Sequence, residues 1–209
     1  ATDAVVAKIG KQKPHPRPLT QGGSPDLQRK AKLLDRFIQA QFDISDVYRE
    51  MTRAFLDCGV FGTGCLKVFA DDDRLHVERV YPSELFVHQQ DGMYKKPRTI
   101  IQKRWVSREA LIEDWPDEDG EKEELIRSAG REDTDGHDEF DIWYDPIADQ
   151  VLVLEAWHVG PKGKGGKHVI CVDSGTLLCE DWDYPWLPFE FITWSEDLQG
   201  FWGKGIAYE

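Results

Sequence analysis

The chain contains little cysteine, and the spacing of its cysteines excludes two common uses of that residue. Its 209 residues include four: Cys58, Cys65, Cys171 and Cys179. No two of them have the Cys-x-x-Cys spacing of a zinc site, and four are too sparse for the disulfide scaffold of a small secreted domain. We therefore expect free, partly buried thiols in a reducing compartment.

Long hydrophobic runs are also missing. No stretch of about 18 apolar residues is present to span a membrane, and no charged-then-apolar leader precedes a cleavage site. The sequence therefore predicts a soluble chain of cytosolic origin without a membrane partner. The chain begins at Ala1 without an initiator methionine and ends at Glu209, which we interpret as a fragment of a longer protein.

Basic charge is scarce and unevenly distributed. The formal net charge is −13, from 26 Lys and Arg against 39 Asp and Glu. Residues 113–141 carry 14 acidic and 3 basic residues, a net charge of −11, whereas residues 1–36 carry 8 basic and 3 acidic residues, a net charge of +5. A protein that grips DNA phosphates gathers Lys and Arg over a broad surface. We expect any nucleic acid near this chain to be guided rather than bound.

No catalytic constellation can be ordered from the sequence. His76, His88, His158 and His168 are scattered over predicted strands, and no Ser-His-Asp or Cys-His set emerges. Lys204, between two glycines, lacks the upstream glycine of a phosphate-binding loop. The sequence therefore predicts no catalytic residue and no cofactor.

Acidic clusters suggest a divalent cation but lack its full pattern. Asp117-x-Asp119-Gly120 and Asp133-x-Asp135-Gly136 resemble pieces of a calcium loop, yet neither continues with the twelve-residue ligand pattern. Asp71, Asp72 and Asp73 are adjacent, and consecutive strand residues point to opposite faces. We predict solvated acidic turns and no metal ligand.

The stretch 45–80 combines a helix, a glycine turn and a hairpin. Apolar residues recur at helical spacing behind the N-cap Ser45: Val47, Met51, Ala54, Phe55 and Cys58. Gly59, Gly62 and Gly64 then stop the helix, and a β-hairpin follows over residues 65–80. A phosphate-binding loop has the opposite order, because its glycines precede a helix N-terminus. These glycines are therefore predicted to form a structural turn or hinge, and Gly200, Gly203 and Gly205 a second one.

The remaining pattern predicts an α+β fold, with N-terminal helices packed on a largely antiparallel, hairpin-rich sheet. Residues 1–23 form a helix end and a Pro-rich strap, and residues 24–62 a pair of antiparallel helices. Residues 63–116 form a sheet with a helix, in which the strand 98–106 lies beside the hairpin. An acidic insertion follows at 117–137 with a helix at 121–129. Residues 138–199 form a β meander with four strands, at 139–144, 151–159, 168–172 and 188–194.

Several stretches, taken together and in order, resemble the portal (head-to-tail connector) proteins of tailed double-stranded DNA bacteriophages and their prophages. They extend from Tyr48 to Ile206: YREMTRAFLDCGVFGTGCLKVF, VERVYPSELFVHQQDG, QKRWVSREALIEDWPD, VLEAWHVG, GKHVICVDSGTLLCEDWD and PFEFITWSEDLQGFWGKGI. The strap and the helix after it fit the same pattern. No single stretch is specific, but the ordered series is.

The resemblance implies a non-enzymatic, ring-forming protein, typically dodecameric, at one capsid vertex of the virion. The ring would be the channel through which DNA enters and leaves without sequence-specific binding. Its partners would be terminase, tail and adaptor proteins, and capsid and scaffold proteins, with assembly in the host cytoplasm. Residues 24–206 would form the wing domain and residues 200–209 the start of the first stem helix, so that stem, clip and crown are absent.

A second reading stays open beside the portal. Paired carboxylates near Trp115, Trp143 and Trp157 are also typical of a carbohydrate-binding or glycoside-processing β domain. That reading predicts a groove lined by tryptophan with two close carboxylates. A nucleotide-binding enzyme would need a glycine loop between a strand and a helix, which the sequence lacks.

Overall fold

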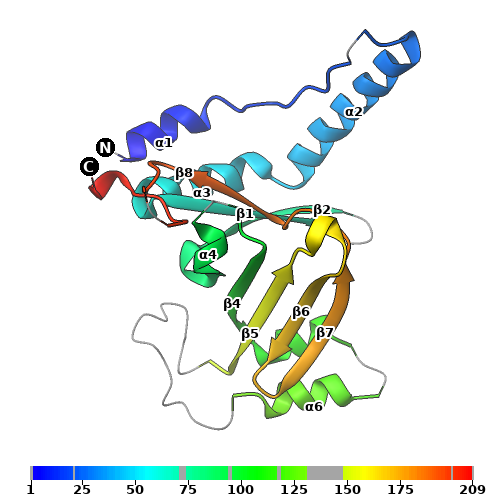
Figure 1. The fold of residues 1–209 in the computed structure, drawn as a ribbon, viewed down its shortest axis with the longest axis vertical. Coiled ribbons are helices and arrows are strands. Elements are labelled where there is room, and N and C mark those ends of the chain that lie inside the picture. Colours follow the sequence, from blue (N-terminus) through cyan, green and yellow to red (C-terminus); the bar gives the residue numbers. More distant parts are fainter. Residues whose placement is uncertain are drawn as a thin grey trace. The chain divides into compact units, whose positions relative to one another are not determined.

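The computed structural model describes residues 2–20, 22–70, 74–93, 96–116, 119–130, 148–198 and 200–208. The chain divides into two compact units (Figure 1). The first comprises Ala1–Pro82, Pro188–Leu198 and Trp202–Glu209, and the second comprises Ser83–Leu187 and Gln199–Phe201. Both combine helices with antiparallel strands, so the predicted α+β class is confirmed.

Three helices open the first unit: α1 (Thr2–Gly10), α2 (Pro25–Ile44) and α3 (Val47–Phe61). The start of α2 follows its sequence, since the Ser24 side chain accepts a hydrogen bond from the N–H of Leu27 and proline occupies the first turn. The expected antiparallel pairing of α2 with α3 is wrong. None of the residues of α2, all of which are described, is buried, and it is α1 that lies against α3 (Figure 1).

A three-stranded antiparallel sheet completes the first unit. It consists of β1 (Thr63–Ala70), β2 (Leu75–Val80) and β8 (Phe189–Thr193), in the order β2-β1-β8. The predicted hairpin is confirmed, with Cys65 opposite Val80. The strand predicted at 188–194 exists, but it leaves the meander and pairs with β1, placing Phe191 opposite Cys65.

The second unit contains a five-stranded antiparallel sheet in the order β3-β4-β5-β6-β7. Its strands are β3 (Leu85–Val87), β4 (Thr99–Ser107), β5 (Gln150–His158), β6 (Gly166–Val172) and β7 (Gly175–Trp182). The strand predicted at 98–106 pairs with β3 and β5 instead of the hairpin. Of the four strands of the predicted meander, those at 151–159 and 168–172 pair as β5 and β6, while β7, which pairs with β6, was not predicted.

Short helices accompany the strands: α4 (Gln89–Gly92), α5 (Arg108–Asp114) and α6 (Glu121–Ser128), with 3-10 turns at Pro82–Glu84, Pro161–Gly163 and Ile206–Tyr208. The helix predicted within residues 63–116 corresponds to α5, and the helix predicted at 121–129 corresponds to α6. Leu111 of α5 and Ile126 of α6 pack on Val151, Val153 and Leu177 to form the core of the second unit. No helix among the described residues is long and apolar enough to cross a membrane.

Arg108 fastens α6 to the start of β5. Its side chain is almost fully buried, and Nη1 donates to the carbonyl oxygens of Ile126 and of Ala129, the latter at 2.9 Å. Nε donates to both carboxylate oxygens of Asp149, at 2.9 and 3.0 Å. One guanidinium therefore satisfies carbonyls that the end of α6 leaves unpaired, because the last turn of a helix has no intrahelical donor for them.

Part of the predicted architecture lies outside the described residues. This applies to the strand expected at 139–144, to Asp71, Asp72 and Asp73, and to Asp117 and the Asp133-x-Asp135-Gly136 motif.

Candidate functional site

The two glycine-rich segments singled out in the sequence meet in the first unit. Gly62 caps α3 with φ +89°, a conformation that favours glycine. Its carbonyl accepts a hydrogen bond from the N–H of Trp194 at 3.0 Å, and the N–H of Gly203 donates to Oγ1 of Thr63 at 2.8 Å. A Cβ on either Gly62 or Gly203 would overlap the carbonyl of the other. Only glycine allows the two backbones to approach this closely.

The same junction includes three more of the six predicted glycines. A Cβ on Gly64 would overlap the carbonyl oxygen of Ala54, and one on Gly205 would overlap that of Val60. Gly59 does not end the helix as expected: it is buried within α3, which continues to Phe61. We call Gly59, Gly62, Gly64, Gly203 and Gly205 the glycine junction.

Gly200 lies apart from the junction, in the second unit. It has φ +103°, and a Cβ there would meet no described atom within 4 Å. Its conformation therefore requires glycine, but its packing does not. A bend of the chain about any of these six glycines stays a prediction.

A buried ion pair joins α3 to β2 beside the junction. Nε of Arg79 donates to Oδ2 of the buried Asp57 at 2.5 Å, and a second bond joins Nη2 to Oδ1. This pairing raises the pKa of Arg79, whose guanidinium also lies 4.1 Å from the ring centroid of Tyr81. Burial raises the pKa of the neighbouring Cys58 thiol, which keeps it protonated and unreactive.

A polar cluster in the second unit centres on His168 in β6. Its Nδ1 lies 2.7 Å from Oε1 of Glu180 in β7, and its Nε2 lies 2.9 Å from Oε1 of Glu155 in β5. Burial lowers the pKa of His168, but the hydrogen bonds to the two glutamates raise it more, so that the net shift is upward. Both ring nitrogens can donate only in the imidazolium form, and in that form His168 bridges two carboxylates across three strands.

Aromatic rings adjoin this cluster. The buried Trp157 stacks on His168 with ring centroids 5.0 Å apart, and Trp182 meets the other side edge-on. Trp182 donates its Nε1–H to the carbonyl of Trp186 at 2.8 Å, and Tyr184 lies between these two rings. Trp186 and Tyr184 are exposed. The sequence reasoning missed this cluster, because only the strand register brings its members together.

The tryptophans of the carbohydrate reading do not gather around paired carboxylates. Trp115 is half-buried at the end of α5, with Nζ of Lys122 5.2 Å from its ring centroid, and Trp157 is buried. Trp143 lies outside the described residues. The two close glutamates, Glu155 and Glu180, are both occupied by His168. In this part of the chain the two carboxylates are hydrogen-bonded to one imidazole and are not free for acid–base chemistry.

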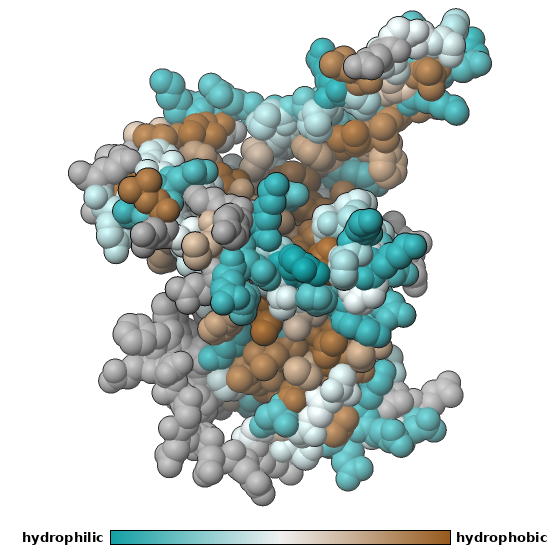
Figure 2. Space-filling model, viewed as in Figure 1, coloured by the Kyte–Doolittle hydropathy of each residue, from teal (hydrophilic) through white to brown (hydrophobic). Residues whose placement is uncertain are grey.

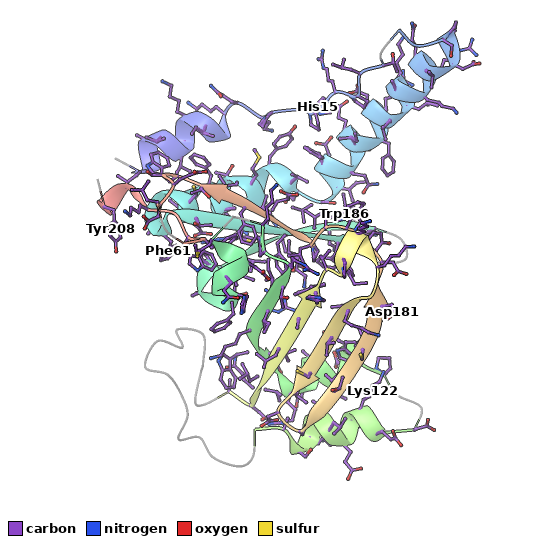
Figure 3. All side chains as sticks on the ribbon, viewed as in Figure 1. His15, Phe61, Lys122, Asp181, Trp186 and Tyr208 are labelled. Carbon is purple, nitrogen blue, oxygen red and sulfur yellow. The ribbon has the colours of Figure 1, made fainter. Side chains whose placement is uncertain are left out.

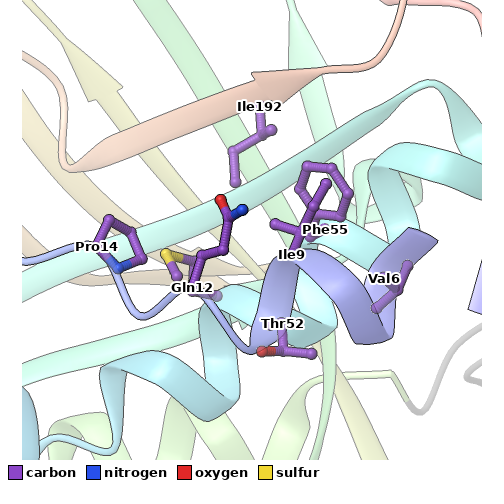
Figure 4. Close-up of a pocket in the computed structure, with 9 residues that line it drawn as sticks. Val6, Ile9, Gln12, Pro14, Thr52, Phe55 and Ile192 are labelled. Carbon is purple, nitrogen blue, oxygen red and sulfur yellow. The ribbon is translucent and has the colours of Figure 1, made fainter. Parts of the chain in front are cut away.

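The first unit also has a cavity of about 170 Å³ between α1, the strap, α3 and β8 (Figure 4). Apolar side chains form most of its wall: Val6, Ile9, Met51, Phe55 and Ile192. A cavity of this size and character can take a small apolar group. Among the described residues, no group of three or more His, Cys, Asp or Glu is arranged to hold a metal ion.

An apolar face of α2 is open to solvent. Five large side chains on it are between 48% and 63% exposed, and we call them the helix face: Leu27, Leu33, Leu34, Phe37 and Ile44. At 3.6 residues per turn they fall within about a third of the circumference of the helix. Figure 2 shows apolar side chains gathered along α2.

The strap does not cover this face, because it contacts another side of α2. Nε2 of His15 lies 3.1 Å from Oδ1 of Asp35, and the His15 ring meets Phe42 edge-on. Tyr48 donates its hydroxyl hydrogen to the carbonyl of Pro14. No described element packs over the helix face. Single exposed apolar residues are ordinary, but five large ones within a third of the circumference of one helix are typical of a surface that another structure covers.

Comparison with models of known protein families finds no match, and comparison with curated proteins finds no significant relative.

Proposed function

We propose that this chain is the wing region of a portal subunit from a tailed double-stranded DNA bacteriophage or prophage. In this role it is a structural part of an oligomeric ring, typically dodecameric, at one vertex of the capsid. The ring forms the channel for DNA packaging and ejection, and the chain itself carries out no chemical reaction.

The structural observation that carries the proposal is the open helix face on α2. A helix of 20 residues without a buried side chain gains little from its own chain, because tertiary packing supplies most of the stability of a helix. Burial of apolar surface is worth about 25 cal/mol per Å². A component of an assembly has a use for such a face, whereas an enzyme that acts alone does not.

The segments that resemble portal proteins occur in the same order along the chain, from Tyr48 to Ile206. This order is our reason for proposing that the assembly is a portal. The fold is compatible with this resemblance, since the strap, the helices and the antiparallel sheets follow one another along the chain. The resemblance places the start of the stem helix at residues 200–209, where the described residues form a 3-10 turn at Ile206–Tyr208 and no α-helix.

The charge distribution is compatible with a channel protein. A net charge of −13 repels DNA, so that a duplex near this chain can slide without being held. We propose that the DNA passes without sequence-specific contacts. The other partners in the proposal are terminase, tail or adaptor proteins, and capsid and scaffold proteins, and the location is the virion.

The carbohydrate alternative has weaker support. The exposed rings of Tyr184 and Trp186 would suit a sugar, because sugars stack on aromatic faces. The adjacent glutamates, however, are both bonded to His168. A glycoside hydrolase needs one carboxyl group free as an acid and the other free as a base or nucleophile.

The test is the assembly state of the chain extended past Glu209 through the expected stem. Light scattering and electron microscopy measure its mass and shape. We expect a closed ring with a central channel. If the extended chain stays monomeric across protein and salt concentrations, and no ring appears in the microscope, the proposed function is wrong.

A further inference from the structure

The cavity of the first unit is bounded by four segments of the chain: α1, the strap, α3 and β8 (Figure 4). We call it the α1 cavity. None of the described residues that line it is charged, and its polar side chains are those of Gln12 and Thr52. An apolar cavity of about 150 Å³ is large enough to bind benzene. With a volume of about 170 Å³, the α1 cavity has room for one aromatic ring.

The distance between α1 and α3 is fixed where Gly10 meets Thr52. A Cβ on Gly10 would lie 3.3 Å from Oγ1 of Thr52, so the end of α1 already contacts α3 there. The Thr52 hydroxyl donates its hydrogen to the carbonyl of Tyr48 at 2.7 Å, which holds this side chain in place. Helix α1 therefore cannot move closer to α3 at this point and fill the cavity itself.

The strap is anchored by contacts of its own. Tyr48 donates its hydroxyl hydrogen to the carbonyl of Pro14, and Nζ of Lys13 lies 5.3 Å from the centroid of the Tyr48 ring. Nε2 of His15 lies 3.1 Å from Oδ1 of Asp35, and Figure 3 shows His15 on the strap beside α2. Close packing favours the collapse of a void, and these contacts oppose it. The cavity is therefore a stable feature of the fold.

Gln12 supplies the hydrogen-bonding capacity of the wall. The Thr52 hydroxyl hydrogen is already donated to Tyr48, whereas the carboxamide of Gln12 makes no bond to any described residue and points toward Ile192 (Figure 4). A carboxamide can both donate and accept. A cavity needs two to four polar partners to hold a water molecule, more than this wall offers. An apolar ligand with one polar group fits it better.

Two lining side chains favour an aromatic ligand. Phe55 lines the cavity, and its ring also meets that of Trp194 edge-on, with centroids 6.0 Å apart. Met51 adds a thioether to the wall. Aromatic rings gain from edge-to-face or offset contacts with other rings and from contacts with the sulfur of methionine. A charged ligand is disfavoured, because the wall has no opposite charge to offset its lost hydration.

We propose that the α1 cavity binds a small, uncharged aromatic molecule with one hydroxyl group, of which phenol is the simplest. The ring lies against Phe55 and Met51, and the hydroxyl group bonds to the carboxamide of Gln12. The bound molecule contacts α1, the strap, α3 and β8 together and holds them in place. This inference goes beyond the proposed function and does not depend on it.

The two methionines of the chain provide the first test. Met51 lines the cavity, whereas Met93 is exposed in the second unit, so methyl NMR of the methionine-labelled 209-residue chain contains its own control. Phenol should shift the Met51 signal until it saturates, with a dissociation constant of about 1 mM or lower, and should leave the Met93 signal in place. Benzoate, which carries a negative charge on the same ring, should shift neither signal.

Three variants separate the cavity from the chemistry of the ligand. Ile192→Phe fills the cavity with a ring and keeps Met51 as the reporter, so phenol should bind at least about 10-fold more weakly. Val60→Phe adds the same ring at a half-exposed position outside the cavity and is the matched control. Gln12→Leu removes one hydrogen bond, so phenol should bind about 3- to 10-fold more weakly and toluene as before.

Urea unfolding gives a readout that does not depend on NMR. A ligand that binds only the folded state stabilises it, so saturating phenol should raise the urea midpoint of the wild type and of Val60→Phe. The midpoint of Ile192→Phe should not change. Circular dichroism checks that each variant is folded, and if Ile192→Phe does not fold, the two methionine signals of the wild type decide alone.

Three results would overturn the inference. They are a Met51 signal that phenol does not shift, Met51 and Met93 signals that shift alike, and a folded Ile192→Phe variant that binds phenol as tightly as the wild type. Equal losses of phenol and toluene binding in Gln12→Leu would overturn the assigned class of ligand. The proposed function fails separately, through the assembly state of the extended chain, which phenol binding does not test.

Discussion

The peptide groups of Gly62 and Gly203 are in contact, although about 140 residues separate them in the sequence. Each glycine occupies the space in which the Cβ of the other would stand. The contact joins the C-terminal end of α3 to the segment after β8, and the bond from Gly203 to Thr63 ties the same segment to β1. The junction holds the end of α3 in place.

Alanine at Gly62 should destabilise the chain more than alanine at Gly200. Both glycines have positive φ, which costs an L-residue about 1 to 2 kcal/mol. Only Gly62 is crowded, and overpacking adds about 1 to 3 kcal/mol. Urea unfolding measures the difference in the free energy of unfolding. Equal losses in the two variants would show that the backbone contact contributes nothing.

Replacing Arg108 by methionine should lower the free energy of unfolding by about 2 to 4 kcal/mol, because buried carbonyls lose a charged donor. Methionine keeps the apolar stem of the side chain. Arg127→Met is the matched control: its guanidinium is exposed and pairs with Glu123 one turn away, which is worth about 0.5 kcal/mol or less. If both variants unfold at the same urea concentration, Arg108 does not fasten α6.

Stability should fall as the pH rises above the ordinary histidine pKa of 6.5, because the folded state raises the pKa of His168. A raised pKa means that the folded state holds the proton more tightly. The stabilisation is complete below 6.5 and is lost as the pH passes through the folded pKa.

Urea midpoints measured from about pH 5 to about pH 9 follow this loss across the titration range of histidine. His168→Gln should flatten the profile in that range. His158→Gln, which alters an exposed histidine bonded to Thr99 on the same sheet, should keep it. A wild-type profile that rises with pH through this window would contradict the charged bridge between Glu155 and Glu180.

Three of the four thiols should differ clearly in their reaction with a thiol reagent under native conditions. Cys179 is exposed and should be modified first. Cys58 and Cys65 are buried, and burial raises the pKa of Cys58, so both should react only when the chain opens. Mass spectrometry after timed labelling identifies the modified residues. Fast labelling of Cys58 would contradict the packing of α3 on β1.

Helix caps and turn residues correctly predicted the start of α2 and the β1–β2 hairpin. Ser24, Pro25 and Asp26 mark the start of α2, and the turn-bounded alternation of residues 65–80 marks the hairpin, because caps and turns act over a few residues. The strand β7 was not predicted, because apolar and polar residues do not alternate regularly in its sequence, GTLLCEDW. Its position depends on cross-strand pairing with β6, which no short window contains.

Long-range contacts set the limit of sequence reasoning. The sequence identified each glycine of the junction separately. It did not show that the two glycine-rich segments are in contact, because about 140 residues separate them. The His168 bridge needs the register of three strands, and a slip of one residue would send its side chains to the other face. Leu27, Leu34 and Phe37 recur at helical spacing in the sequence, but whether another element covers them depends on contacts that no short window contains.

Immunogold labelling of opened phage particles that carry this chain tests the central claim most directly. An antibody raised against the 209-residue chain is applied to emptied capsids, and the label is located by electron microscopy. The account predicts gold at one vertex of each capsid, where the tail attaches. Label spread over the whole capsid or along the tail, or particles without label, would contradict a portal.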